Sequence, residues 1–180
     1  MGSMFINSND WVSLIFRLTL ALLVGCLIGL NRQQGGRPAG IRTFMLVSLG
    51  AAMFVMIPLQ AEGDSPYAAT NALSRTVQGV ATGVGFIGAG MILQQSHREL
   101  GRLEVKGLTT AATIWVAAGL GAAIGCGLWQ MSLIGAILTL VILSGVKKIQ
   151  KSSLIRFRHS QRGKSGKSHA KESEDSQTKE

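Results

Sequence analysis

The fold is decided by long apolar stretches, the first of which is WVSLIFRLTLALLVGCLIGL, Trp11 to Leu30. Arg17 is its only charged residue, and about 20 helical residues are enough to cross the hydrocarbon core of a bilayer. Four similar stretches follow, separated by short polar breaks: Thr43 to Leu59, Thr76 to Leu93, Thr109 to Ile124 and Leu128 to Val146. The chain is therefore predicted to be an all-α, polytopic membrane protein with five transmembrane helices.

Residues at the ends of these stretches indicate where the helices stop. Pro58, followed by Glu62 and Asp64, is expected to end the second helix, since proline interrupts helical hydrogen bonding. Thr109 is expected to cap the fourth helix, because a threonine side chain can accept a hydrogen bond from a free backbone N–H. Residues 125–127, Gly-Cys-Gly, are expected to form a tight connection to the fifth helix.

The charged residues divide the 180-residue chain into two unlike parts. The first 146 residues hold 13 of the 27 charged side chains, whereas the last 34 hold 14 and contain few apolar residues. We expect residues 1–146 to form the transmembrane bundle and residues 147–180 to form a basic, largely disordered tail. Such a tail cannot bury enough apolar surface to offset its ordering entropy.

Lysine and arginine residues in short loops predict the orientation of the helices, because basic loops stay on the cytoplasmic side. Basic residues follow the first, third and fifth stretches: Arg32, Arg37, Arg42, Arg98, Arg102, Lys106, Lys147, Lys148 and Lys151. The second loop carries Glu62 and Asp64, and the N-terminal segment carries only Asp10. We therefore expect the N-terminus outside and the C-terminus inside.

Small residues four positions apart mark the faces on which membrane helices pack. The first, third and fourth stretches each contain such a glycine pair, and the third contains further glycines: Gly25 and Gly29, Gly79 and Gly83, Gly121 and Gly125, with Gly85, Gly88 and Gly90. We predict that all of them serve helix packing. The segment GVGFIG, residues 83–88, has the spacing of a dinucleotide fingerprint. It lies inside a span and not after a strand, so no nucleotide or other cofactor is expected.

Arg17 and Arg75 are intramembrane polar candidates, and Gln78 is a third. Each arginine precedes a line of small residues spaced by four, so it lies near the face that its helix offers to neighbours. An intramembrane charge costs at least about 2.5 kcal/mol and is usually turned inward and paired. Two alternatives are open: a structural role, by snorkelling or by bonding to helix-end carbonyls, and a functional polar site.

The spans lack the residues of several chemistries. They contain no Asp or Glu, whereas Mg²⁺ and Ca²⁺ are bound through carboxylates, carbonyls and waters. His97, His159 and His169 lie outside the spans, which argues against an intramembrane Ser–His protease. Cys26 and Cys126 have no CxxC neighbour and are expected to be structural thiols. No metal site, catalytic residue or enzymatic activity is expected.

Three blocks of sequence resemble the MgtC/SapB family of bacterial membrane proteins in order and spacing. They are residues 17–43, which end in NRQQGGRPAGIRT, residues 83–90, GVGFIGAG, and residues 106–115, KGLTTAATIW. The resemblance covers about residues 11–146. Its family-motif residues are Asn31, Arg32, Arg37, Pro38, Gly40, Arg42, Thr43, Gly107, Leu108, Thr109 and Thr110.

The resemblance implies a five-helix domain in the bacterial inner membrane, with an internal membrane as the alternative location. It also implies a regulatory role linked to growth at low magnesium and to restraint of the ATP synthase. Asn31 and Ala72 stand where the family commonly has acidic residues, and Gly79, beside Gln78, stands where it has a glutamine. The basic tail replaces a folded C-terminal domain, so the short SapB-like branch is the closer comparison.

Three functions remain open from the sequence. The first is a regulator that binds the ATP synthase or ion transporters, or a second copy of itself, through glycine-lined helix faces. The second is a small transporter or channel for Mg²⁺ or another small solute, with Arg17 and Arg75 along its path. The third is a tether whose tail has nine basic residues and no acid between Lys147 and Lys171. That tail is expected to bind anionic lipid rather than nucleic acid.

Overall fold

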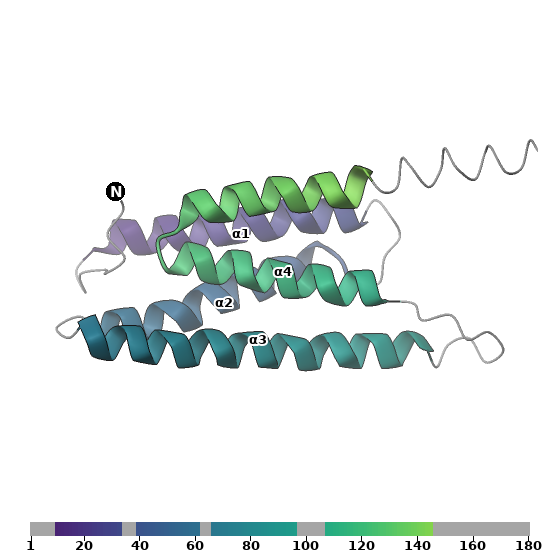
Figure 1. The fold of residues 1–180 in the computed structure, drawn as a ribbon. Helices are drawn as coiled ribbons and strands as arrows, with labels where there is room; N and C mark the ends of the chain where they lie inside the picture. The colour runs from purple at the N-terminus through teal and green to yellow at the C-terminus, as the bar shows by residue number, and fades with distance from the viewer. Residues whose placement is uncertain (1–9, 34–38, 62–65, 97–106, 146–180) are drawn as a thin grey trace, which may run out of the picture. The chain divides into compact units, whose positions relative to one another are not determined.

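A computed structural model describes residues 10–33, 39–61, 66–96 and 107–145, and these residues form five helices and no strand. The labelled helices are α1 (Trp11–Gln33), α2 (Ile41–Ala61), α3 (Pro66–Ser96) and α4 (Leu108–Gly125), and a fifth helix spans Trp129–Gly145 (Figure 1). The predicted all-α architecture with five helices is confirmed. By length and composition α1 to α4 can each cross a membrane, and the fifth is a shorter apolar helix.

The chain divides into two units, Met1–Leu140 and Val141–Glu180. The first contains α1 to α4 and the fifth helix as far as Leu140, and it is the unit described below. Of the second unit, the structure describes only residues 141–145. The predicted basic tail, residues 147–180, lies outside the described residues.

The starts of α1 and α4 are stabilised in different ways, by a capping side chain and by a glycine respectively. Asp10 precedes α1, where its carboxylate accepts hydrogen bonds from the backbone N–H of Ser13 at 3.2 Å and from its hydroxyl at 2.6 Å. At α4 the capping residue is Gly107, with φ 98°, a left-handed conformation that favours glycine. The prediction that Thr109 caps this helix is wrong, because Thr109 already lies inside its first turn.

All four labelled helices are longer than predicted, and α2 and α3 differ most from the prediction. α2 continues through Pro58 to Ala61, so the expectation that Pro58 ends the helix is wrong. Neighbouring helices and side chains allow proline inside membrane helices. α3 begins at Pro66, ten residues before the predicted Thr76, and proline suits a first helical position because its missing N–H has no intrahelical partner there.

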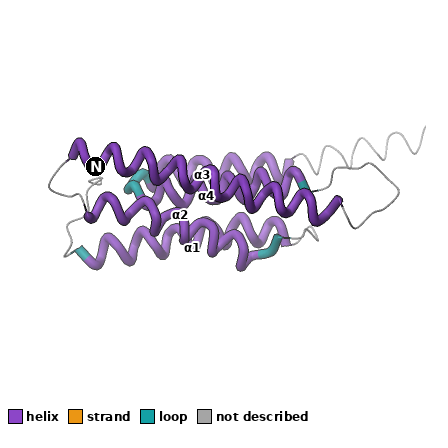
Figure 2. Tube along the Cα trace, turned by 90° about the horizontal axis from the view of Figure 1, so that it is seen from below, coloured by secondary structure: helices purple, strands orange, loops and turns teal. Residues whose placement is uncertain are grey.

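The core lies where α1, α2 and α4 meet, and these helices run side by side with α3 (Figure 2). Buried side chains from all three helices form one cluster: Ala21, Val24, Ile28, Phe44, Ala52, Ile114, Ala117, Leu120 and Ile124. The apolar window of α4 is 67% buried, whereas that of α3 is only 6% buried. The unit therefore has a close-packed three-helix centre, with α3 as its exposed edge.

Candidate functional site

Arg32 and Thr110 bring two of the family-motif blocks together. Arg32 lies in the last turn of α1, is 1% exposed and donates a hydrogen bond through Nη2 to Oγ1 of Thr110, in the first turn of α4. The prediction that Arg32 lies in the loop after the first stretch is wrong, because α1 continues to Gln33. A buried cation is costly unless its donors are satisfied, so this bond ties α1 to α4 at a charge that is almost completely buried.

The remaining family-motif residues lie near the end of α1 and the starts of α2 and α4, or outside the described part. Asn31 is half-buried beside Arg32 in the last turn of α1. The carbonyl of Gly40 accepts hydrogen bonds from the N–H groups of Thr43 and Phe44, so Gly40 starts α2. Exposed positions are held by Arg42, Leu108 and Thr109, while Arg37 and Pro38 lie outside the described residues.

Glycines on α1 and α4 allow both helices to approach the backbone of α2. A Cβ built at Gly25 would lie 2.6 Å from the carbonyl oxygen of Phe44, and one built at Gly29 would lie 2.6 Å from Cα of Ile41. On α4, a Cβ at Gly125 would lie 2.6 Å from the carbonyl oxygen of Ala52. Gly121 meets the backbone of Ser48 in the same way. A side chain at any of these four glycines would force α2 to move.

The glycines of α3 have different surroundings. Gly88 packs against Ala111 of α4, whose Cβ would lie 3.2 Å from a Cβ at Gly88. A Cβ built on the other predicted packing glycines of this helix would meet no atom within 4 Å: Gly79, Gly83, Gly85 and Gly90. Within the described helices, therefore, no contact supports the packing prediction for these four positions.

Arg17 binds the end of α4. It is 8% exposed, and its Nη1 donates a hydrogen bond of 2.8 Å to the carbonyl oxygen of Gly125, the last residue of that helix. The final carbonyls of a helix lack intrahelical partners and carry partial negative charge, so a cation is favourable there. Gly127, at φ +81°, lies against the guanidinium group. This geometry matches the structural alternative for Arg17.

Arg75 and Gln78 lie in a different environment from Arg17. Both are exposed on α3, within the part of that helix that can span a membrane. Among the described residues, no hydrogen bond or ion pair involves the Arg75 side chain. The two arginines that the sequence paired as candidates therefore differ: one is buried against a helix end and the other faces outward.

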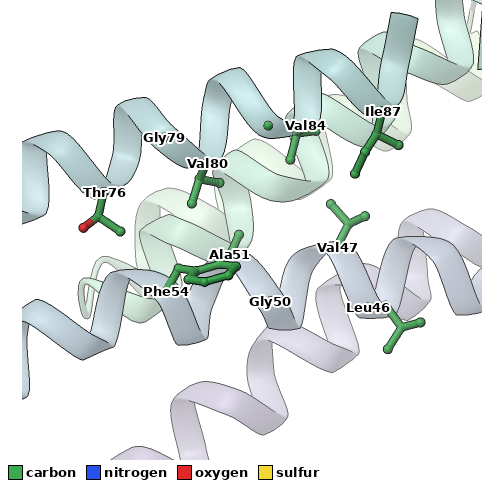
Figure 3. A pocket seen from close by; sticks show the side chains of 11 residues that line it. Leu46, Val47, Gly50, Ala51, Phe54, Thr76, Gly79, Val80, Val84 and Ile87 are labelled. Atoms are coloured by element: carbon green, nitrogen blue, oxygen red, sulfur yellow. The ribbon is translucent and has the colours of Figure 1, made fainter. Parts of the chain in front are cut away.

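An open groove runs between α2 and α3, with a volume of about 660 Å³. Its walls are almost entirely apolar, and Figure 3 shows Val80, Val84 and Ile87 of α3 pointing toward α2. The lining includes three glycines and one hydroxyl-bearing residue: Gly50, Gly79, Gly83 and Thr76. Sequence reasoning identified two of these glycines but not the groove, which depends on the angle between two helices.

Two interhelical serines were missed by the sequence reasoning. The hydroxyl of Ser48 donates to the carbonyl oxygen of Ala21 at 2.8 Å and joins α2 to α1. The hydroxyl of Ser132 donates to the carbonyl oxygen of Leu120 at 3.0 Å and joins the fifth helix to α4. Both serines are fully buried. A serine within an apolar span was the available signal, since such hydroxyls bond across membrane helices.

The described residues contain no group of three or more His, Cys, Asp or Glu side chains that could hold a metal ion. The polar side chains buried there instead bond to backbone carbonyls or to one another, as Arg17, Ser48 and Arg32 do. The arrangement is suited to holding helices in fixed positions and offers a groove for an apolar ligand.

Comparison with known proteins identifies relatives of this chain. It is 63% identical to Protein SrpB of Synechococcus elongatus over 158 residues, which cover 87% of each chain. It is 38% identical to the protein of Escherichia coli K12 named "Putative magnesium transporter YhiD" over 138 residues, 72% of this chain and 58% of that one. It is also 38% identical to Protein MgtC of Salmonella typhimurium, over 70% of this chain and 49% of that one.

No solved structure matches the chain. The match spans only about half of the MgtC and YhiD sequences, so those relatives contain long segments that this comparison does not cover. The model of the MgtC family matches residues 18–152, which include all of the three resembling blocks except Arg17. The chain therefore belongs to the MgtC family.

Proposed function

We propose that this chain is a regulatory protein of the bacterial inner membrane that supports growth at low magnesium by binding other membrane proteins. The ATP synthase and ion transporters are the proposed partners. The observation that carries the proposal is the α2–α3 groove. It is an apolar, glycine-lined surface within the membrane-spanning helices, beside the packed centre of α1, α2 and α4. Membrane helices associate through such close-packed, small-residue surfaces.

The distribution of charge also favours binding over cation transport. The five helices contain four arginines and no Asp or Glu: Arg17, Arg32, Arg42 and Arg75. A pathway for Mg²⁺ requires oxygen ligands, and an arginine beside the path raises the energy of a cation in it. Arg17 and Arg32 are also bonded to helix ends, which suits a scaffold.

Co-reconstitution tests the regulatory proposal. Purified ATP synthase is placed in liposomes with increasing amounts of the full chain, and ATP-driven proton pumping is measured with a pH-sensitive dye. We expect pumping to fall as the chain is added and to stay constant when an unrelated helical membrane protein is added at the same ratio. Affinity capture from native membranes should recover ATP synthase or transporter subunits. Unchanged pumping and no such recovery would contradict the proposal.

The second candidate is a small transporter or channel for Mg²⁺ or another small solute, and it is favoured by the name of the YhiD relative, which describes that protein as a magnesium transporter. Uptake into liposomes separates the two candidates. The regulatory proposal expects Mg²⁺ entry into liposomes loaded with a Mg²⁺-sensitive dye to equal that of empty liposomes. Entry that grows with the amount of chain would support the transporter instead.

We also propose that the N-terminus faces outward and that the tail faces inward, where residues 147–171 bind anionic lipid. A reporter fused after Glu180 should be active only on the cytoplasmic side. Removing residues 152–180 should weaken binding to vesicles that contain anionic lipid and leave binding to neutral vesicles unchanged. Outward activity of the reporter would reverse the orientation, and equal vesicle binding would remove the lipid role of the tail.

A further inference from the structure

The groove between α2 and α3 is long enough to bind part of one helix. Along α3 it extends from Thr76 to Ile87, about three helical turns or roughly 16 Å. Leu46, Gly50 and Phe54, spaced by four, form its edge on α2. Gly50 stands at the middle of that edge, between two large side chains that are more than half exposed. The centre of the groove is therefore lined at backbone level, and its ends are lined by side chains.

The same chain shows what occupies such surfaces elsewhere in the fold. The glycine pairs of α1 and α4 each receive the backbone of α2, with built Cβ atoms as close as 2.6 Å to it. Gly79 and Gly83 have the same spacing, yet a Cβ on either would meet no atom within 4 Å. The α2–α3 groove therefore carries the glycine spacing of the other two contacts, and no helix of the described part of the chain fills it.

Arg75 supplies a charge at one end of this groove. It lies four residues before Gly79, so it shares the face of α3 that carries Gly79 and Gly83 at the edge of the groove, and its side chain is exposed outside the lining. It is about nine residues from the start of α3, within the apolar span. A cation at that position calls for an anionic partner, because an intramembrane charge is costly when unpaired. Within the described ranges, none of the five helices contains an Asp or Glu to supply one.

We propose that the α2–α3 groove binds one transmembrane helix of a different protein, and that a single Asp or Glu on that helix pairs with Arg75. This inference rests on the proposed regulatory function and names the chemistry of its partner. The partner helix lies over Gly50, Gly79 and Gly83. Its carboxylate is at the depth of Arg75, one residue or about 1.5 Å beyond the end of the groove at Thr76.

A second copy of this chain does not meet that requirement. Two copies in one membrane have the same orientation, so their Arg75 side chains lie at equal depth. A symmetric dimer through the groove would bring those two like charges toward each other, and the described helices of either copy offer no carboxylate between them. Charge complementarity therefore favours a heterologous helix.

Designed peptides test the proposal with the full-length chain. The probe is a 23-residue Leu-Ala transmembrane peptide with lysine ends and one Glu six residues from its outer end, and the control peptide has Gln at that position. Energy transfer between the labelled chain and the labelled peptide is measured in neutral phosphatidylcholine liposomes. We expect the Glu peptide to bind at least tenfold more tightly than the Gln peptide, and Arg75→Gln to remove this difference while Arg75→Lys retains it.

Two matched glycine variants locate the binding surface. Gly79→Leu fills the groove and should abolish binding of both peptides. Gly85→Leu adds the same side chain to the same helix outside the groove, so it should leave binding unchanged. Both glycines have open space around them, and leucine is the better helix former, so both variants should fold.

Three results would overturn the proposal. Equal binding of the Glu and Gln peptides would remove the role of Arg75. Arg75-dependent retention of anionic lipid by the purified chain, with no peptide binding, would make a lipid the occupant of the groove. Energy transfer between two labelled copies that is lost in Gly79→Leu would make a second copy the occupant. None of these results affects the co-reconstitution assay, so this proposal and the regulatory function fail separately.

Discussion

Arg32, at the end of α1, donates a hydrogen bond to the hydroxyl of Thr110, at the start of α4, across a separation of 78 residues in the chain. The guanidinium group is almost completely buried, and so is its acceptor. α4 starts here at Gly107, a glycine in a left-handed conformation. One buried charge therefore fixes the position of α4 relative to α1.

Thr110→Val should lower the free energy of unfolding by about 1.5–3 kcal/mol, because it removes the acceptor of a hydrogen bond from a charged donor. Thr110→Ser keeps the hydroxyl and should cost much less. Chemical or thermal unfolding of the detergent-solubilised chain measures both variants. A double-mutant cycle with Arg32→Met should give a coupling energy of at least about 0.5 kcal/mol. Additive effects of the two substitutions would contradict the pairing.

Gly125→Ala should destabilise the bundle by about 1–3 kcal/mol, since its methyl group would overlap the backbone of α2 at Ala52. Gly85→Ala adds the same group where no atom lies within 4 Å. It should leave stability unchanged or raise it slightly, because alanine favours helix more than glycine does. Unfolding in the same detergent compares the two variants directly, and equal losses at both positions would contradict the packing described here.

The number of helices and their order could be predicted from the sequence, because a bilayer requires apolar stretches of defined length. Their boundaries could not be predicted as well. Residues 66–75, which include Thr70, Asn71 and Ser74, are more polar than the stretch that follows them, yet they extend α3 by ten residues. The polar residues at the end of a membrane helix hide its start from a reading of hydropathy alone, although residues 67–94 together are apolar enough to cross a membrane.

The candidate site was less accessible to prediction. In the sequence, Arg32 looks like one of the basic loop residues that set the orientation of the helices. Its burial could not be predicted, because it depends on Thr110, a distant residue on another helix. The three glycine pairs have identical spacing, but those of α1 and α4 meet α2 and that of α3 borders an open groove. Spacing identifies a surface that a helix could approach, and only the three-dimensional packing shows which surfaces are already filled.

Gly127→Ala should destabilise the turn after α4 by about 1–2 kcal/mol, because residue 127 has φ +81° and alanine is strained there. The new Cβ would also lie 3.0 Å from Nη2 of Arg17, and it would disturb the bond of that side chain to Gly125. Gly119→Ala, on the exposed side of α4 with open space around it, is the matched control and should be neutral or stabilising. Equal thermal stability of the two variants would show that this turn does not require glycine.

Protonation of Asp10 should loosen the start of α1 at acid pH. The hydrogen bonds from the Ser13 hydroxyl and N–H lower the pKa of the Asp10 carboxyl from its ordinary value of 3.8, and the positive charge of Arg17 lowers it further. A lowered pKa in the folded protein means that the carboxylate stabilises the helix start above pH 3.8, and that this contribution is lost as the pH falls through the lower folded value.

The amide proton of Ser13 reports this change directly, since it donates to the Asp10 carboxylate. Its protection factor against hydrogen exchange, measured by NMR in detergent micelles, should be higher at pH 6 than at pH 2.5. Asp10→Asn provides the control, because asparagine caps a helix with a neutral oxygen that does not titrate in this range. Its protection factor should be nearly constant between the two pH values. A constant protection factor in the unsubstituted chain would instead mean that Asp10 does not cap α1 in the micelle.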